Sequence, residues 1–371
     1  MDASLNKKLE NVQWGEYRLG DLFVSSNGDF DIQKNHINGK GEYVITAGVK
    51  ENGIMGKTDI AAKIFEENTI TVDMFGYAFY RVFKYKMVTH ARVFSLKSKL
   101  KLTERTGIFI VSAFHFLNSK FGYENMCSWA KIKDEYIQLP IKNGEIDFEF
   151  MESFVAELEA QRVAELEAYL LATGLKDYEL TDKEKQAVED YENGRINLIE
   201  LKVSDIFNVS SSKKRFDANK VDILTKGYPY VVRTSNNNGI KGYLNEDINY
   251  LNEGNTISFG QDTATMFYQE NPYFTGDKIK ILKSKFKNFN KYSAQYFIGT
   301  MSKSFSSFSW GASSFSEKAI NKQRIFVKVK DNEIDFEYIE TLISAIQKLV
   351  IRDVVIFADR RIEATKQVID R

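Results

Sequence analysis

Two stretches of the chain space their apolar residues three and four positions apart, as along one face of an α-helix. The first stretch has them at Phe148, Met151, Val155, Leu158, Leu166 and Leu170. The second has them at Phe336, Ile339, Ile343, Ile346, Val350, Val354 and Phe357. The pattern predicts helices over 147–172 and 335–369. At 1.5 Å per residue they measure about 40 and 50 Å.

The residues at the ends of these stretches agree with helix boundaries. Asp147 and Asp335 are natural N-caps, because a short carboxylate accepts hydrogen bonds from the free N–H groups of the first turn. Gly174 suits the left-handed cap at the end of the first helix. The run 181–184, Thr-Asp-Lys-Glu, is a capping box that predicts a shorter helix ending near Gly194.

The stretches before each long helix have a different pattern. They contain many Gly, Asn, Ser and aromatic residues, and their apolar runs are short and bounded by turn residues, as at 43–46 and 230–233. Such runs predict β-strands. Each half of the chain is therefore expected to be a mixed α/β (α+β) domain followed by a long helix.

The halves are repeats of one another at a spacing of about 184–188 residues. The clearest match is Glu-Ile-Asp-Phe-Glu-Phe-Met-Glu at 145–152 with Glu-Ile-Asp-Phe-Glu-Tyr-Ile-Glu at 333–340. Weaker matches in the same order join 19–23 with 203–207, 52–56 with 238–242, 68–71 with 255–258 and 96–99 with 282–285. Two long repeats indicate a duplicated domain. We expect domains at 1–144 and 197–332, a central helical region at 145–196 and a C-terminal helix at 333–371.

Two long amphipathic helices in one chain most simply pack antiparallel, as a coiled-coil spacer between the two domains. The alternative is that each helix folds back onto its own domain.

The net charge of zero conceals strongly charged segments. The chain has 51 Lys and Arg against 51 Asp and Glu. Segment 201–330 has 20 cations against 10 anions, a net +10, and 14–140 has 17 against 14, or +3. Segment 145–194 has 4 against 15, or −11, and 331–371 has 6 against 9, or −3. Basic domains favour a polyanionic partner such as nucleic acid.

Several functional classes lack support in the sequence. One Cys and three His provide neither a disulfide framework nor zinc-ligand spacing, so we expect no metal. Gly56-Lys57-Thr58 resembles the end of a phosphate-binding loop, but residue 51 is Glu where that loop needs glycine. We find no catalytic constellation and expect no cofactor. Without an apolar run of membrane-spanning length or a signal core, the expected location is cytoplasmic.

The basic domains place cations beside amides, hydroxyls and aromatic rings. Lys and Arg suit phosphates, and Asn, Gln and Arg can also bond base edges. The candidate DNA-binding residues are Lys50, Asn52, Lys57, Tyr77, Arg81, Lys213, Lys214, Arg215, Arg233, Asn236, Asn237, Asn238, Lys241, Gln261, Thr263 and Thr265. The Asn-Gly sites also fit ordinary turn chemistry, because Asn and Gly tolerate positive φ.

The duplicated order of domain and helix resembles the specificity subunits of Type I restriction-modification systems. The run Ile137-Gln138-Leu139-Pro140-Ile141 before Glu145, and the run from 154 to 174, resemble that family's conserved helix. The resemblance implies two target-recognition domains that bind double-stranded DNA at a bipartite site, and no catalytic activity. It also implies methyltransferase (modification) subunits and motor-nuclease (restriction) subunits as partners. The common Pro-Pro-Leu start of the helix is absent, since Ile141 follows Pro140.

The sequence is therefore interpreted as a non-catalytic DNA-recognition subunit. Two other interpretations stay open. One is a stand-alone DNA-modifying enzyme, which binding of S-adenosylmethionine to the chain alone would favour. The other is a duplicated protein-interaction adaptor, whose binding would depend less on salt than that of a DNA-binding protein.

Overall fold

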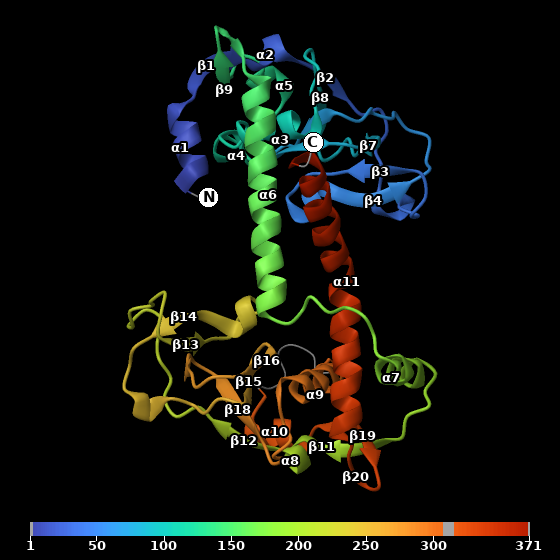
Figure 1. The fold of residues 1–371 in the computed structure, drawn as a ribbon, viewed down its shortest axis with the longest axis vertical. Helices are drawn as coiled ribbons and strands as arrows, with labels where there is room; N and C mark the ends of the chain where they lie inside the picture. Colours follow the sequence, from blue (N-terminus) through green and yellow to red (C-terminus); the bar gives the residue numbers. More distant parts are fainter. Residues whose placement is uncertain (1–2, 307–314, 370–371) are drawn as a thin grey trace. The chain divides into compact units, whose positions relative to one another are not determined.

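The structure is a computed structural model that describes residues 3–306 and 315–369 (Figure 1). Contacts divide the chain into unit 1, made of 1–168 and 358–371, and unit 2, made of 169–357. Both unit boundaries fall inside the long helices. The predicted domains include residues 1–2, 307–314 and 370–371, which lie outside the described residues.

Unit 1 contains three small sheets with strand orders β1-β9-β10, β2-β8-β5-β6 and β4-β3-β7. All neighbouring strands are antiparallel except β3 and β7, which are parallel. The strands are β1 (Gln13–Arg18), β2 (Phe23–Asn27), β3 (Glu42–Ile45), β4 (Ile54–Thr58), β5 (Thr69–Val72), β6 (Ala78–Arg81), β7 (Tyr85–Met87), β8 (Phe94–Ser98), β9 (Tyr136–Lys142) and β10 (Glu145–Ile146).

The core of unit 1 lies between the β2-β8-β5-β6 sheet and its helices. Val72 and Leu96 of the sheet are fully buried in one cluster with Phe109 of α3 and Phe154 of α6. The rings of Phe109 and Phe154 meet edge to face at 5.8 Å. The helices of this unit before α6 are α1 (Ala3–Asn11), α2 (Leu19–Leu22), the 3-10 helix η1 (Lys34–His36), η2 (Lys50–Gly53), α3 (Glu104–Ser112), α4 (Leu117–Lys120) and α5 (Trp129–Ile132).

Unit 2 repeats the same three sheets in the same order: β11-β19-β20, β12-β18-β15-β16 and β14-β13-β17, with β13 and β17 the parallel pair. The duplication and the mixed α/β class inferred from the sequence are confirmed. The strands are β11 (Leu198–Lys202), β12 (Phe207–Ser211), β13 (Tyr228–Val231), β14 (Ile240–Leu244), β15 (Thr256–Gly260), β16 (Met266–Gln269), β17 (Phe274–Thr275), β18 (Ile279–Ser284), β19 (Arg324–Lys330) and β20 (Glu333–Ile334).

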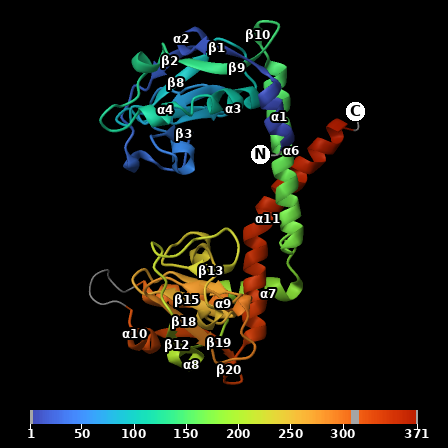
Figure 2. The same cartoon turned by 90° about the vertical axis from the view of Figure 1, so that its left-hand side faces the viewer.

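The core of unit 2 is built in the same way. Ile257 and Leu282 of the larger sheet pack with Phe297 of α9, and all three are fully buried. Figure 2 shows α9 beside the strands of this sheet. The helices of this unit before α11 are α7 (Asp182–Glu192), α8 (Val203–Ile206), η3 (Asn237–Gly239), η4 (Ile248–Tyr250), α9 (Lys291–Phe305) and α10 (Glu317–Lys322).

The two long helices begin and end where their sequences predict. They are α6 (Phe148–Ala172) and α11 (Phe336–Ile369). The Asp147 carboxylate accepts a hydrogen bond from the Phe150 amide at 2.9 Å, and the Asp335 carboxylate accepts one from the Tyr338 amide at 3.0 Å.

Gly174, at φ +69°, closes α6 with a double hydrogen bond. Its own amide donates to the Leu171 carbonyl, and the Leu175 amide donates to the Leu170 carbonyl. This pair is the Schellman arrangement that a left-handed glycine permits. The capping box between Thr181 and Glu184 is also present, at the start of α7.

The apolar stripe predicted for α11 is correct only in the first half of the helix. Phe336 and Ile339 are buried. Farther along, the buried residues are Leu342, Ala345, Val355 and Ala358, while the predicted residues face solvent. These are Ile346, Val350, Val354 and Phe357, with exposed fractions of 40%, 74%, 38% and 51%, and Leu349 beside them is 39% exposed. The helix has more apolar residues than one face can hold, so spacing alone selected the wrong set.

Candidate nucleic-acid interface

Each repeat carries a tight turn that holds predicted DNA-binding residues. In unit 1, η2 contains Lys50 and Asn52, and in unit 2, η3 contains Asn237 and Asn238. Asn52 and Asn238 both have φ of 52°, and each is followed by a glycine with positive φ. Asn is the non-glycine residue most at ease in this left-handed region. The turn chemistry considered from the sequence is therefore present, and it leaves the side chains of these four residues exposed.

Asp73 joins the η2 turn to the β5–β6 hairpin. Its Oδ2 accepts the Gly48 amide at 2.7 Å, just before the turn. Its Oδ1 accepts the amides of Phe75 at 2.9 Å and Tyr77 at 3.0 Å, inside the hairpin connection. The candidate Tyr77 is thereby held beside the turn that carries Lys50.

Arg81 was expected from the sequence to contact DNA, and its burial contradicts that expectation. Only 2% of it is exposed, and its guanidinium is used inside unit 1. Nε donates to the Thr71 hydroxyl at 2.9 Å, and Nη2 donates to the Asn52 carbonyl at 2.8 Å. Burial lowers its pKa to about 10, so the group stays charged at neutral pH. Residue type alone could not distinguish this buried arginine from a surface one.

Unit 2 joins its turn and hairpin through different side chains. Arg233, directly after the β13 region, forms an ion pair with Asp262 of the β15–β16 connection. Lys278 also lies 2.9 Å from Asp262. In the same connection the hydroxyls of Thr263 and Thr265 are 2.8 Å apart. The Gln261 carbonyl accepts the amide of Phe315 at 3.2 Å, and its side chain is half-buried.

The basic run 213–215 is tied to its own surroundings. The Lys214 ammonium lies over the rings of Phe216 and Tyr250, at 4.7 and 4.4 Å from their centres. Arg215 pairs with Asp277 at 3.0 Å. All three side chains of the run remain exposed.

The remaining candidates lie on strands and turns next to η2 and η3. Lys57 of β4 is half-buried with its ammonium 4.3 Å from the ring centre of Tyr43. Lys241 of β14 is exposed, as is Asn236 at the start of η3. Each unit thus brings its turn, the following strand and a hairpin end together.

Sequence reasoning missed three residues that organise these surfaces: Asp73, Asp262 and Gln269. A signal for one of them existed. Phe79-Tyr80 before Arg81 and Phe267-Tyr268 before Gln269 match at an offset of 188, so the repeat itself relates the two residues. Nothing in the local sequence marks Asp73 as buried.

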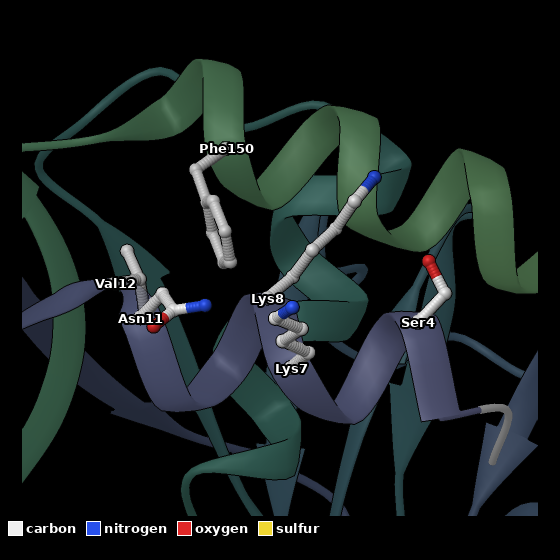
Figure 3. A pocket seen from close by; sticks show the side chains of 6 residues that line it. All are labelled: Ser4, Lys7, Lys8, Asn11, Val12 and Phe150. Atoms are coloured by element: carbon white, nitrogen blue, oxygen red, sulfur yellow. The ribbon is translucent and has the colours of Figure 1, made fainter.

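Away from these turns, unit 1 has a hollow of about 460 Å³ between α1 and α6 (Figure 3). Lys7, Lys8 and Asn11 approach it from α1, and Phe150 enters it from α6. Lys8 forms an ion pair with Glu157 of α6. The hollow therefore belongs to the packing of these two helices.

Within the described residues no helix has the length and apolarity needed to cross a bilayer. The same part of the chain holds no group of three His, Cys, Asp or Glu side chains placed to bind a metal ion.

Comparison with known proteins assigns the repeats. The model of the Type I restriction modification DNA specificity domain matches residues 11–168 and again 198–354. The chain is 28% identical over 156 residues to the specificity subunit S.BcgI of a Type II restriction enzyme from Heyndrickxia coagulans. That match spans 42% of this chain and 45% of the relative's length.

The fold is also found in a solved structure. The crystal structure of a Type-I restriction-modification system S subunit from M. genitalium superposes with a TM-score of 0.59 at 15% identity. The superposition covers 97% of this chain and 95% of that one. Because the family model matches both repeats and well over half of the residues, the protein belongs to the Type I restriction modification DNA specificity family.

Proposed function

We propose that the chain is a sequence-specific DNA-recognition subunit that reads a bipartite target, one block with each repeat. The observation that carries this proposal is the duplicated pair of a tight turn and a hairpin end. Both copies present exposed amides and cations, such as Asn52 with Lys50 and Asn237 with Lys241. Amides suit base edges and cations suit phosphates, so each copy has the means to bind and to discriminate.

The proposed chemistry assigns different roles to the candidates. Lys50 and Lys241 are exposed, and no carboxylate among the described residues pairs with them; in this proposal they act on the phosphate backbone and set affinity. Asn52, Asn237 and Gln261 act on base edges and set sequence preference. Arg81 does not contact DNA in this proposal, because its side chain is buried.

We further propose that the chain binds two copies of one modification subunit and has no catalytic activity of its own. Two equivalent apolar grooves support the first part. In unit 1 a groove of about 630 Å³ lies between α3, β9 and α6, lined by Ile108, Tyr136 and Leu158. Unit 2 has a groove of about 540 Å³ between α9, β19 and α11. A duplicated surface suits a duplicated partner.

The grooves match residue for residue along the repeat. On the strands, residues 136–138 of β9 correspond to 324–326 of β19 at an offset of 188. On the helices the offset is the same: 154, 155 and 158 of α6 correspond to 342, 343 and 346 of α11. Each groove also has a large exposed ring on its strand: Tyr136 of β9 is 57% exposed, and Phe326, two positions beyond the equivalent residue of β19, is 58% exposed. Large exposed apolar side chains around a groove are typical of protein interaction sites.

In the full assembly we expect restriction subunits to join this complex.

We also propose that α6 and α11 act as an antiparallel spacer between the two recognition domains. Two observations support it. The residues of α11 from Ala358 onward group with unit 1, and there Arg361 lies 4.0 Å from Glu159 of α6.

The test is to express the chain with its modification subunit and to map the methylated sites. A split target with two short blocks and a fixed gap is expected, and binding should weaken steeply with salt. Methyl transfer or S-adenosylmethionine binding by the chain alone would contradict the proposal in favour of a stand-alone enzyme. Binding to the partner without salt-dependent DNA binding would favour the adaptor interpretation.

A further inference from the structure

Two buried polar side chains occupy the same position in the two repeats. In the β5–β6 pairing Arg81 lies opposite Thr69, and in the β15–β16 pairing Gln269 lies opposite Thr256. Arg81 is 2% exposed and Gln269 is 4% exposed. The two hairpins agree in register at every pair, so the correspondence is structural as well as sequential.

The two side chains donate to equivalent acceptors. Arg81 donates to the Thr71 hydroxyl at 2.9 Å and to the Asn52 carbonyl at 2.8 Å. Gln269 Nε2 lies 3.1 Å from both the Ser258 hydroxyl and the Asn238 carbonyl, and donates to each.

The acceptors themselves are equivalent. Thr71 and Ser258 share a register position in β5 and β15. Asn52 and Asn238 each precede the glycine that ends the tight turn of their repeat, η2 or η3.

The geometry of the turns explains why this donor is needed. A residue at φ of 52° turns its carbonyl away from the strand ladder, so the ladder cannot satisfy it. The carbonyl of the following glycine is already used: Gly53 accepts the Thr46 amide and Gly239 accepts the Val232 amide, both at 2.8 Å. The carbonyls of Asn52 and Asn238 remain, and a buried donor from the neighbouring hairpin satisfies each of them.

We propose that Arg81 and Gln269 are positioning residues for DNA reading. Each fastens the turn of its repeat to the neighbouring hairpin, so that the turn and the hairpin end present their side chains as one surface. The role depends on a buried N–H donor and not on positive charge, since a neutral amide performs it in unit 2. This inference rests on the proposed DNA-recognition function and deepens it.

The experiment uses the full chain in complex with its modification subunits. Three variants are compared with the wild type: Arg81→Met, Arg81→Gln and Gln269→Met. Lys84→Met removes an exposed cation from the same unit and serves as the matched control. The measurement is the affinity for target duplexes that carry single mismatches in one block or the other.

Arg81→Met should reduce discrimination against mismatches in one block about tenfold or more, and Gln269→Met should do so in the other block. Arg81→Gln places the unit 2 side chain in unit 1 and should retain discrimination to within about threefold. The proposal is overturned if Arg81→Met and Arg81→Gln lose discrimination equally, or if either Met variant loosens both blocks together.

The salt dependence separates positioning from phosphate contact. If Arg81 bound a phosphate, Arg81→Gln would lower the salt slope of non-specific binding by about one. An unchanged slope is expected, and a lowered slope would contradict the proposal.

Hydrogen exchange separates failure of this role from failure of the proposed function. The Thr46 amide donates to the carbonyl of Gly53, the last residue of η2. This amide should exchange at least tenfold faster in Arg81→Met than in Arg81→Gln. Equal exchange in the two variants refutes the positioning role whether or not DNA binds. A wild-type complex that prefers no duplex refutes the DNA-recognition proposal alone.

Discussion

Asp73 is a buried residue whose carboxylate accepts hydrogen bonds from backbone amides. It is 3% exposed and accepts the amides of Gly48, Phe75 and Tyr77. One side chain accepts all three hydrogen bonds, so removing it leaves three half-buried amides without their acceptor. Asp73 and Arg81 together therefore hold the η2 turn of unit 1 against the β5–β6 hairpin.

We predict that Asp73→Ala lowers the free energy of unfolding by about 2–3 kcal/mol, because the three amides lose their acceptor. Denaturant titration of the dilute free chain, at a concentration where it does not aggregate, measures this change. Asp73→Asn, which keeps one acceptor oxygen, should lose less. The exposed Glu124→Gln is the control and should lie within about 0.5 kcal/mol of the wild type. A change of that small size in Asp73→Ala would refute the prediction.

A second prediction concerns the exposed cations of the two turns. Lys50→Ala and Lys241→Ala should each weaken binding to all duplexes by a similar factor and reduce the salt slope by about one. Asn237→Ala should instead change the preferred bases in one block and leave the slope unchanged. Binding titrations across a salt series distinguish these effects, and altered base preference in Lys50→Ala would contradict the assignment.

Residue chemistry predicted the tight turns that carry candidate residues, but it did not predict which of the candidate side chains are buried or paired. The Asn-Gly turns were visible because Asn and Gly are the residues that tolerate positive φ. The burial of Arg81 and the ion pair between Arg233 and Asp262 were not visible. Both depend on contacts between segments distant in sequence, which a count of local charge cannot include.

Among the elements, α7 is fastened to α11 by a buried carboxylate. Glu184 is 6% exposed, and it accepts hydrogen bonds from Ser344 at 2.7 Å and from Lys348 at 3.1 Å. Burial favours the neutral acid, but the hydrogen bonds from Ser344, Thr181 and Lys348 outweigh it and lower the pKa of Glu184 to about 2. The carboxylate is therefore more acidic in the folded chain than in the unfolded one.

A carboxyl group whose pKa is lower in the folded chain than in the unfolded chain stabilises the fold at any pH above the unfolded-state pKa. This stabilisation is lost as the pH falls toward the pKa of the folded state. We predict that the attachment of α7, worth on the order of 2 kcal/mol at neutral pH, weakens between about pH 4.5 and pH 2. Glu184→Gln should be less stable than wild type at pH 7, and the difference should shrink toward pH 2.5. Unfolding free energies across that range test it. A difference that stays constant with pH would contradict the assignment.

The elements were predictable where local chemistry determines them. N-caps, glycine caps and the capping box act over four or five residues, and α6, α7 and α11 have the expected ends. The buried face of α11 was predictable only near its start, because the choice between Val354 and Val355 depends on what packs against the helix. A spacing of three and four residues is compatible with either valine on the buried face.

For the whole molecule, the duplicated grooves predict the number of partners. Ile108→Asp in unit 1 and Phe326→Asp in unit 2 place a charge in one groove each. We expect each single variant to retain one modification subunit per chain, and the double variant to retain none, because a charge cannot be buried against an apolar partner. The mass of the purified complex measures this. Val24→Asp, which is exposed outside both grooves, is the control. Two subunits bound to the double variant would place the interface elsewhere.

The spacer proposal makes a prediction about the target itself. Inserting four residues after Glu165 adds about 6 Å of helix and about 40° of rotation. The gap between the two blocks should lengthen by one or two base pairs, while both blocks keep their sequence. Mapping of methylated sites, with the modification subunit present, is the measurement. An unchanged gap would show that the helices do not set the spacing.

The exposed apolar side chains of α11 have a consequence for the free chain in the cell. Ile346, Leu349, Val350, Val354 and Phe357 form a hydrophobic strip on one helix, and such strips promote aggregation when nothing covers them. Chain made in excess of its partner should precipitate or be degraded, so the amount of soluble protein follows the supply of partner. Synthesis of the two in balanced amounts then becomes a condition for keeping the recognition subunit in solution.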